Sequence, residues 1–138
     1  KVVALAVLMP IVAGMGGNAG TQVLALMIRG LALGQVGASN VRTLIWKEIR
    51  VALLNGVCLG LLLGGAVWLW FGDPALSGVI FAALVINLSA ASLAGVAVPV
   101  TLKRLGFDPA LASAIFLTTV TDVFGFFAFL GLGTLILL

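Results

Sequence analysis

The chain is poor in charge: Lys, Arg, Asp and Glu make up 8% of its 138 residues. A soluble domain carries about 25% charged residues, whereas 63% of this chain is hydrophobic, so the composition predicts a membrane protein. Histidine and tyrosine are absent, and a single cysteine, Cys58, leaves no partner for an internal disulfide or a Cys-rich metal site. We expect Cys58 to be a small buried hydrophobic residue.

The same shortages argue against two classes of function. Seven Lys or Arg and four Asp or Glu give a net charge of +3, too few and too dispersed for a nucleic-acid surface. Intramembrane hydrolysis needs paired carboxylates, a Ser with a His, or a cluster of metal ligands, none of which is seen in the sequence. We therefore expect neither a nucleic-acid partner nor an enzyme.

What the sequence has in abundance is long apolar runs. Four of them, at about 2–29, 51–72, 76–102 and 109–137, exceed the roughly 20 residues that cross a membrane as a helix. The backbone in lipid must satisfy its own hydrogen bonds, so all four are predicted helices. The predicted fold is an all-α membrane protein, a bundle of four transmembrane helices, with a short interfacial helix over 41–50 and an N-cap at Asp108 before Pro109.

The basic residues predict the orientation of this bundle. Arg29, Arg42, Lys47 and Arg50 cluster at the first connection, and Lys103 with its neighbour Arg104 lies at the third. The positive-inside rule then places the first and third connections in the cytoplasm and both ends of the sequence outside. If the full protein begins in the cytoplasm, an odd number of spans, most simply one, precedes Lys1.

Asp122 is the acidic residue that falls within an apolar run. A charge at mid-membrane costs about 2.5–3.5 kcal/mol, and no Lys, Arg or His lies at comparable depth in the spans. A cation, a water-filled path or protonation must therefore stabilise it; the alternative is a protonated Asp bonded between helices. Ala114 and Thr118 share its helical stripe, which Gly125 is expected to continue, while the phenylalanines nearby point elsewhere.

The stretch MGGNAG, residues 15–20, interrupts the first apolar run with glycines and an amide. One stripe there joins Gly14, Gly17 or Asn18, Thr21 and Ala25. These residues either let helices approach, as Gly16 and Gly20 are expected to do, or unwind the helix near Pro10 and turn carbonyls towards a cation. Asn87, in the third run, predicts an interhelical hydrogen bond.

Two segments resemble the pore of the MgtE-type magnesium channels. Residues 9–22, MPIVAGMGGNAGTQ, with IRGLA at 28–32, look like the second transmembrane helix of that family. Residues 108–110, DPA, with TTVTDVFGF at 118–126, look like the start and centre of the fifth. The resemblance covers essentially the whole chain, which would be the transmembrane pore domain, residues 1–138, without the first transmembrane helix.

The resemblance implies a homodimer whose pore lies on the two-fold axis between these helices. It assigns to Asp122 a largely hydrated Mg²⁺ held jointly with the symmetry mate, and it places backbone oxygens of Gly14 and Thr118 facing that ion. The other pore-lining positions that it implies are Gly17, Asn18, Thr21 and Ala114. Few charged oxygens and room for water suit Mg²⁺, which dehydrates reluctantly.

The expected function is that of a Mg²⁺ channel in the bacterial cytoplasmic membrane, moving the ion inward down the membrane potential. The resemblance also implies cytosolic regulatory domains, including a CBS pair, elsewhere in the full-length chain. Two alternatives stay open: a carrier that exchanges Mg²⁺ for H⁺ or Na⁺ through protonation of Asp122, and a purely structural subunit.

Overall fold

The protein folds into four long α-helices. The computed structural model describes residues 2–37 and 39–137. Its helices are α1 (Val2–Ala32), α2 (Val41–Phe71), α3 (Pro74–Arg104) and α4 (Pro109–Ile136). Each is about 42–46 Å long, more than the roughly 30 Å of a hydrocarbon core. All four are long and apolar enough to cross a membrane, and no strand occurs in 2–37 or 39–137, which confirms the predicted all-α membrane fold.

The turns before α3 and α4 are built in the same way. Asp73 and Asp108 are N-cap residues, and their carboxylates accept hydrogen bonds from backbone N–H groups of the first helical turn. Pro74 and Pro109 follow at the first helical position, where a missing N–H costs nothing. The predicted N-cap at Asp108 is confirmed.

α2 is one continuous helix, which corrects the prediction of a separate interfacial helix over 41–50 and a span from 51. It begins at Val41 and passes without a break through Lys47, Glu48 and Arg50. These three are good helix formers, and no Gly or Pro precedes Gly56 in the helix to interrupt it. At 31 residues, α2 is longer than a membrane requires by about ten residues, which is the length of its charged first turns.

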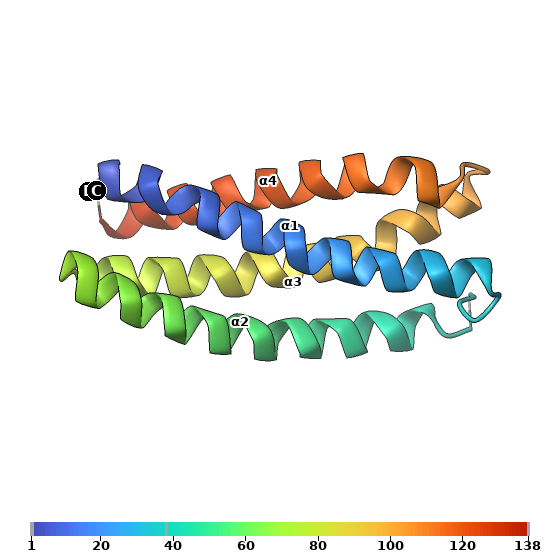
Figure 1. Ribbon diagram of the computed structural model, residues 1–138, viewed down its shortest axis with the longest axis horizontal. Helices are drawn as coiled ribbons and strands as arrows, with labels where there is room; N and C mark the ends of the chain where they lie inside the picture. Colours follow the sequence, from blue (N-terminus) through green and yellow to red (C-terminus); the bar gives the residue numbers. More distant parts are fainter. Residues whose placement is uncertain (1, 38, 138) are drawn as a thin grey trace.

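α3 is the central helix of the bundle. It packs along α1, α2 and α4, whereas α1 and α2 barely touch each other (Figure 1). Its most apolar stretch is 61% buried, against 22–33% in the other three helices. The outer helices therefore keep broad faces that this chain alone does not cover.

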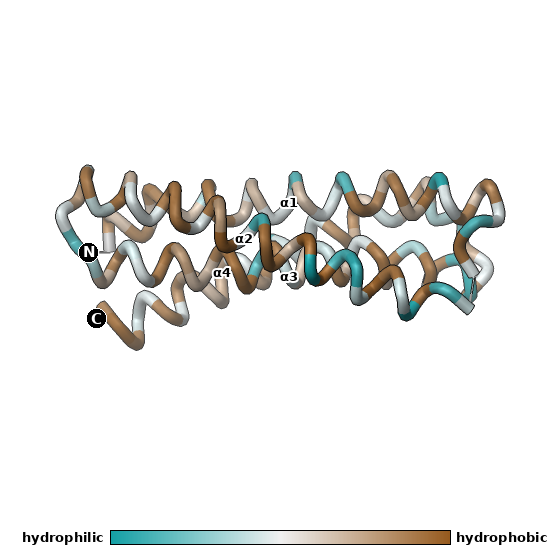
Figure 2. The backbone as a smooth tube through the Cα atoms, turned by 90° about the horizontal axis from the view of Figure 1, so that it is seen from below, coloured by the Kyte–Doolittle hydropathy of each residue, from teal (hydrophilic) through white to brown (hydrophobic). Residues whose placement is uncertain are grey.

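The largest apolar core lies in the half of the bundle that holds the chain termini. Phe129, Ile80 and Leu84 are its largest fully buried side chains. Many other large apolar side chains point outward, as lipid allows, and the tube in Figure 2 is hydrophobic along most of its length. Cys58 is one of these outward residues, which corrects the expectation that it is buried: it lies on the exposed side of α2 with Leu54.

The basic connections lie together at the end opposite the termini (Figure 1). The Nζ of Lys103, in the last turn of α3, donates a hydrogen bond to the backbone oxygen of Leu31 in α1, over 3.2 Å. The opposite end carries the exposed indoles of Trp68 and Trp70 near the end of α2. The two ends of the bundle thus differ in the way that distinguishes the two faces of a membrane.

Candidate functional site

α1 and α4 are antiparallel neighbours in a constant register. Gly20 of α1 faces Leu117 of α4, where a Cβ on the glycine would lie 2.9 Å from the leucine Cδ1. Three residues earlier in α1, the same construction on Gly17 meets the Thr121 hydroxyl at 3.9 Å. In this register Asp122 lies level with Gly16, within about 3 Å along the axis of both Gly14 and Asn18.

The predicted site residues lie on exposed sides of these two helices. Asp122 is exposed at the middle of α4, and Thr118 and Ala114 are exposed one and two turns away on the same stripe. In α1, Gly14, Asn18 and Thr21 are exposed, as is Ala25. Gly17 alone of the predicted set is partly covered, because it faces Thr121.

A groove between α1 and α4 lies in line with these two stripes, towards the chain termini. It is hollowed to about 520 Å³ in the half of the bundle near the termini, between Ala6 and Pro10 on one side and Phe126 and Leu130 on the other. Steps of four residues continue α1 from Pro10 to Gly14 and Asn18, and α4 from Phe126 to Asp122. We call this surface the α1–α4 face; it is apolar near the termini and polar at mid-depth.

The helix α1 is not unwound at its glycines, which corrects that expectation. It is α-helical without a break from Val2 to Ala32, Pro10 included. The Thr21 hydroxyl donates to the Gly17 carbonyl over 2.7 Å, so a side chain adds to the helical bonding there. The backbone oxygen atoms of α1 are therefore those of a regular helix and are not freed by local unwinding.

Threonine hydroxyls of α4 bond mainly to their own helix. Thr119 donates to the Ile115 carbonyl over 2.9 Å, and Thr121 donates to the Thr118 carbonyl over 3.1 Å. In the α-helix the Thr118 oxygen also accepts the backbone N–H four residues further on, so both of its lone pairs already have donors. The backbone-oxygen roles of Gly14 and Thr118 stay predictions.

Two residues of α4 lie where the sequence did not place them. Gly125 is buried, with its Cα side against Ala13 and Asn87, so it does not continue the stripe of Asp122. Phe126 does, since it lines the groove of the α1–α4 face. The spacing of four residues between Asp122 and Phe126 indicates a shared stripe. The hydrophobic side chain of Phe126 had instead suggested that it points away from that stripe.

Asp122 is the one acidic residue at this depth, and no cluster of metal-ligating side chains accompanies it among the described residues. No group of three or more His, Cys, Asp or Glu that could hold a metal ion occurs in the described ranges. One carboxylate with neighbouring amide, hydroxyl and carbonyl oxygens suits a hard cation that keeps most of its water. A closed cage of protein ligands is not what this surface offers.

The other predicted packing contacts are present behind this face. Gly16 and Gly20 admit neighbouring side chains, those of Asn87 and Leu117. Asn87 is fully buried, and its Nδ2 donates to the Val12 backbone oxygen over 2.9 Å, which confirms the predicted interhelical bond.

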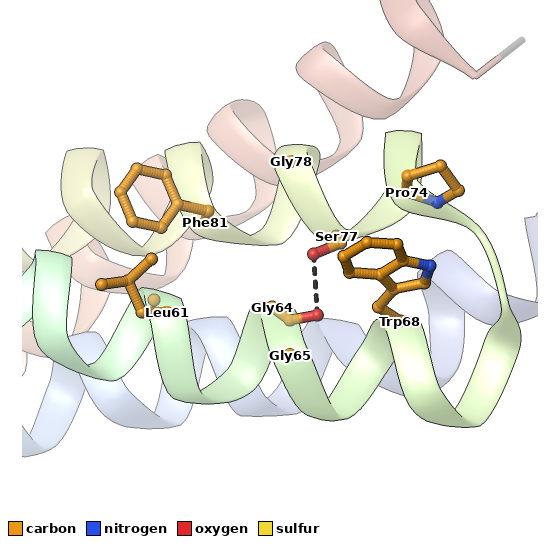
Figure 3. A pocket seen from close by; sticks show the side chains of 9 residues that line it. Leu61, Gly64, Gly65, Trp68, Pro74, Ser77, Gly78 and Phe81 are labelled. Atoms are coloured by element: carbon orange, nitrogen blue, oxygen red, sulfur yellow. Dashed lines mark hydrogen bonds between the residues drawn. The ribbon is translucent and has the colours of Figure 1, made fainter.

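Another hollow, of about 450 Å³ and lined by glycines, lies between α2 and α3 (Figure 3). There the Ser77 hydroxyl donates to the Gly64 carbonyl over 2.7 Å, with Trp68 at one end of the hollow and Phe81 at the other. Ser77 is the polar side chain that lines this hollow, and the hollow carries no charge. It is a packing feature of the α2–α3 pair, separate from the α1–α4 face.

Four helices long and apolar enough to cross a membrane place the chain in the class of integral membrane proteins. Comparison with known families gives the family itself. The model of the MgtE family, described as divalent cation transporter, matches residues 9–132. The chain therefore belongs to the MgtE family, and the resemblance drawn from its motifs is confirmed.

Curated relatives agree with this assignment. The magnesium transporter MgtE of Bacillus subtilis is 35% identical over 134 residues, covering 97% of this chain and 30% of that protein. The magnesium transporter MgtE of Thermus thermophilus is 40% identical over 136 residues, covering 99% of this chain and 30% of the relative. That of Enterococcus faecalis is 40% identical over 119 residues, covering 86% and 26%. The chain thus spans less than a third of the length of these relatives.

Proposed function

We propose that this chain forms the ion-conducting part of a Mg²⁺ channel. The observation that carries the proposal is the position of Asp122, exposed at the middle of α4 on the α1–α4 face, level with the polar part of α1. Membership of a divalent cation transporter family, with relatives named as magnesium transporters, supports Mg²⁺ as the transported ion. An acid at this depth must be stabilised by a cation, by water or by protonation, and a conducted hydrated ion supplies the first two.

The path is completed by a second copy of the chain. The α1–α4 face is open in a single chain, so Asp122 there has nothing opposite it to enclose an ion. A two-fold axis along this face would bring two carboxylates together, matching the charge of one divalent ion. Mg²⁺ would bind mainly through its water, with backbone oxygens of Gly14 and Thr118 and the polar surface of Asn18 and Thr21 around it.

Direction follows from the charges at the two ends. The end with Arg29 and Lys103 is cytoplasmic in this proposal, and the end with the termini is external, in the bacterial inner membrane. A divalent ion moving inward then gains about 4.6 kcal/mol per 100 mV of membrane potential. Cytosolic regulatory domains, CBS-containing by resemblance to the family, would control the path from the part of the full-length protein outside this chain.

Electrical recording separates this channel from its nearest alternative. Full-length protein in planar bilayers should give discrete unitary Mg²⁺ currents that persist without any proton or Na⁺ gradient, because a conducting path needs no coupling ion. A carrier that exchanges Mg²⁺ for H⁺ or Na⁺ would show flux only in the presence of an H⁺ or Na⁺ gradient and would give no unitary current steps. That result would contradict the channel mechanism.

Cross-linking tests whether the α1–α4 face is the two-fold interface. In full-length protein with Cys58→Ala, a cysteine replacing Phe126 should be joined to its copy by a short thiol cross-linker, giving a dimer band. A cysteine replacing Leu62, which is 70% exposed on α2, is the control and should cross-link far less. Equal yields at both positions, or a monomer that still transports Mg²⁺, would contradict the shared interface.

A further inference from the structure

Asn87 is a polar side chain at the centre of the bundle, behind the α1–α4 face. It lies midway along α3 and is 0% exposed. Its Nδ2 donates to the Val12 backbone oxygen of α1 over 2.9 Å. The same nitrogen lies 3.1 Å from the point where a Cβ on Gly125 of α4 would stand, and closer still to that of Gly16 in α1. One amide is therefore wedged between both helices of the proposed path.

The Asn87 amide lies at the depth of the proposed ion site. In the α1–α4 register Gly16 is level with Asp122, and Gly125 follows Asp122 by less than one turn. Asn87 thus contacts the inner side of each helix at the level where Asp122 and Asn18 stand on the outer side. A change in the size or hydrogen bonding of this one side chain would alter the distance between the two helices there.

Packing alone does not explain an amide at this position. The Oδ1 of Asn87 is buried and has no hydrogen-bond partner among the described residues, so part of its polarity is uncompensated. Leucine has the same branched shape, although it is larger, and would carry no such penalty in an apolar core. What leucine lacks is the directional bond to the Val12 oxygen, which ties α1 to α3 while the same amide nitrogen lies against Gly125 of α4.

We propose that Asn87 is a positioning residue that sets the spacing of α1 and α4 at Asp122, and with it the discrimination between divalent cations. The inference rests on the proposed transport function. Hydrated Mg²⁺ and the larger Ca²⁺ differ in size and in how tightly they hold water, so the separation of the two walls decides which passes more readily. Asn87 touches no ion and acts only through the two helices.

The test compares Asn87→Leu with Ser77→Ala in the full-length protein. Each variant removes one hydrogen bond from a side chain to the backbone of another helix, but that of Ser77 joins α2 to α3, away from the path. Mg²⁺ and Ca²⁺ influx into proteoliposomes are measured separately, together with the thermal unfolding temperature. We expect Asn87→Leu to change the Mg²⁺ to Ca²⁺ flux ratio on the order of tenfold and Ser77→Ala to leave it unchanged.

Asn87→Ala is the second variant, since it cannot clash with Gly16, and Asp122→Asn is measured alongside. A folded Asn87 variant with an unaltered flux ratio overturns the positioning role, as does failure of both Asn87 variants to fold while Ser77→Ala folds, because the role is then purely structural. Normal Mg²⁺ flux in Asp122→Asn overturns the proposed function itself, whatever Asn87 does.

Discussion

Replacing Asp122 with asparagine should strongly reduce Mg²⁺ uptake by the full-length protein while its helices stay folded. The two side chains have the same shape, and Asp122 is exposed on α4, so no packing is lost. The charge is lost, and two unit charges about 4 Å apart interact by about 4 kcal/mol at an effective dielectric constant near 20, or twice that for a divalent ion. Losing a third of this lowers the apparent Mg²⁺ affinity about a hundredfold.

Uptake is measured in proteoliposomes over a range of Mg²⁺ concentrations, with Asp73→Asn as the matched control. Asp73 lies outside the path, at the N-cap of α3, where asparagine caps as well as aspartate. The control should therefore transport normally. Uptake by Asp122→Asn within about twofold of the unsubstituted protein would refute the ion site and favour the structural-subunit alternative, since a lost charge of this kind is worth far more than that factor.

The bundle was predictable because a membrane restricts the choices. Sparse charge and four apolar runs leave helices as the one way to satisfy the backbone, and Asp108 before Pro109 signals a helix start by itself. The position of Asp122 was predictable for a related reason: a charge at mid-span is so costly that its presence singles it out. Neither inference needs to know which helix packs on which.

The neighbours of the site depend on that packing, and there the sequence misled. Gly125 follows Asp122 by three residues and could share its stripe, yet α4 turns it towards Asn87. Phe126 was expected, with the other nearby phenylalanines, to point away from the stripe of Asp122, but it lines the groove beside Pro10. A helix has two possible neighbouring stripes at steps of three and four, and the register against α1 decides between them.

The unbroken course of α1 has a similar cause. Glycine permits unwinding but does not require it, and proline within a helix removes one hydrogen bond without ending the helix when neighbours hold it. Here Asn87 bonds to Val12 between Pro10 and the glycines, and Thr21 bonds to Gly17. One bond from a distant residue and one within the helix thus support α1 in a stretch whose local composition suggested unwinding.

Substitution by valine should have opposite effects on thermal stability and Mg²⁺ uptake at Gly16 and at Gly14. Gly16→Val should destabilise the bundle, because its Cβ would collide with the Asn87 amide, which is itself held by Val12. Overpacking of a core typically costs about 1–3 kcal/mol, and a displaced Asn87 adds an unsatisfied amide. Thermal unfolding in mild detergent, followed by size-exclusion chromatography, measures the loss.

Gly14→Val is the matched partner, two residues earlier on the exposed side of α1. A Cβ there meets nothing within 4 Å in the chain, so the fold should be retained. Its methyl groups would project onto the α1–α4 face at the level of Asp122, where they displace water that the ion keeps. We expect near-normal thermal stability and strongly reduced Mg²⁺ uptake for Gly14→Val, the reverse of a pure folding defect. If Gly14→Val instead unfolded as readily as Gly16→Val, or transported normally, the α1 wall of the path would be misplaced.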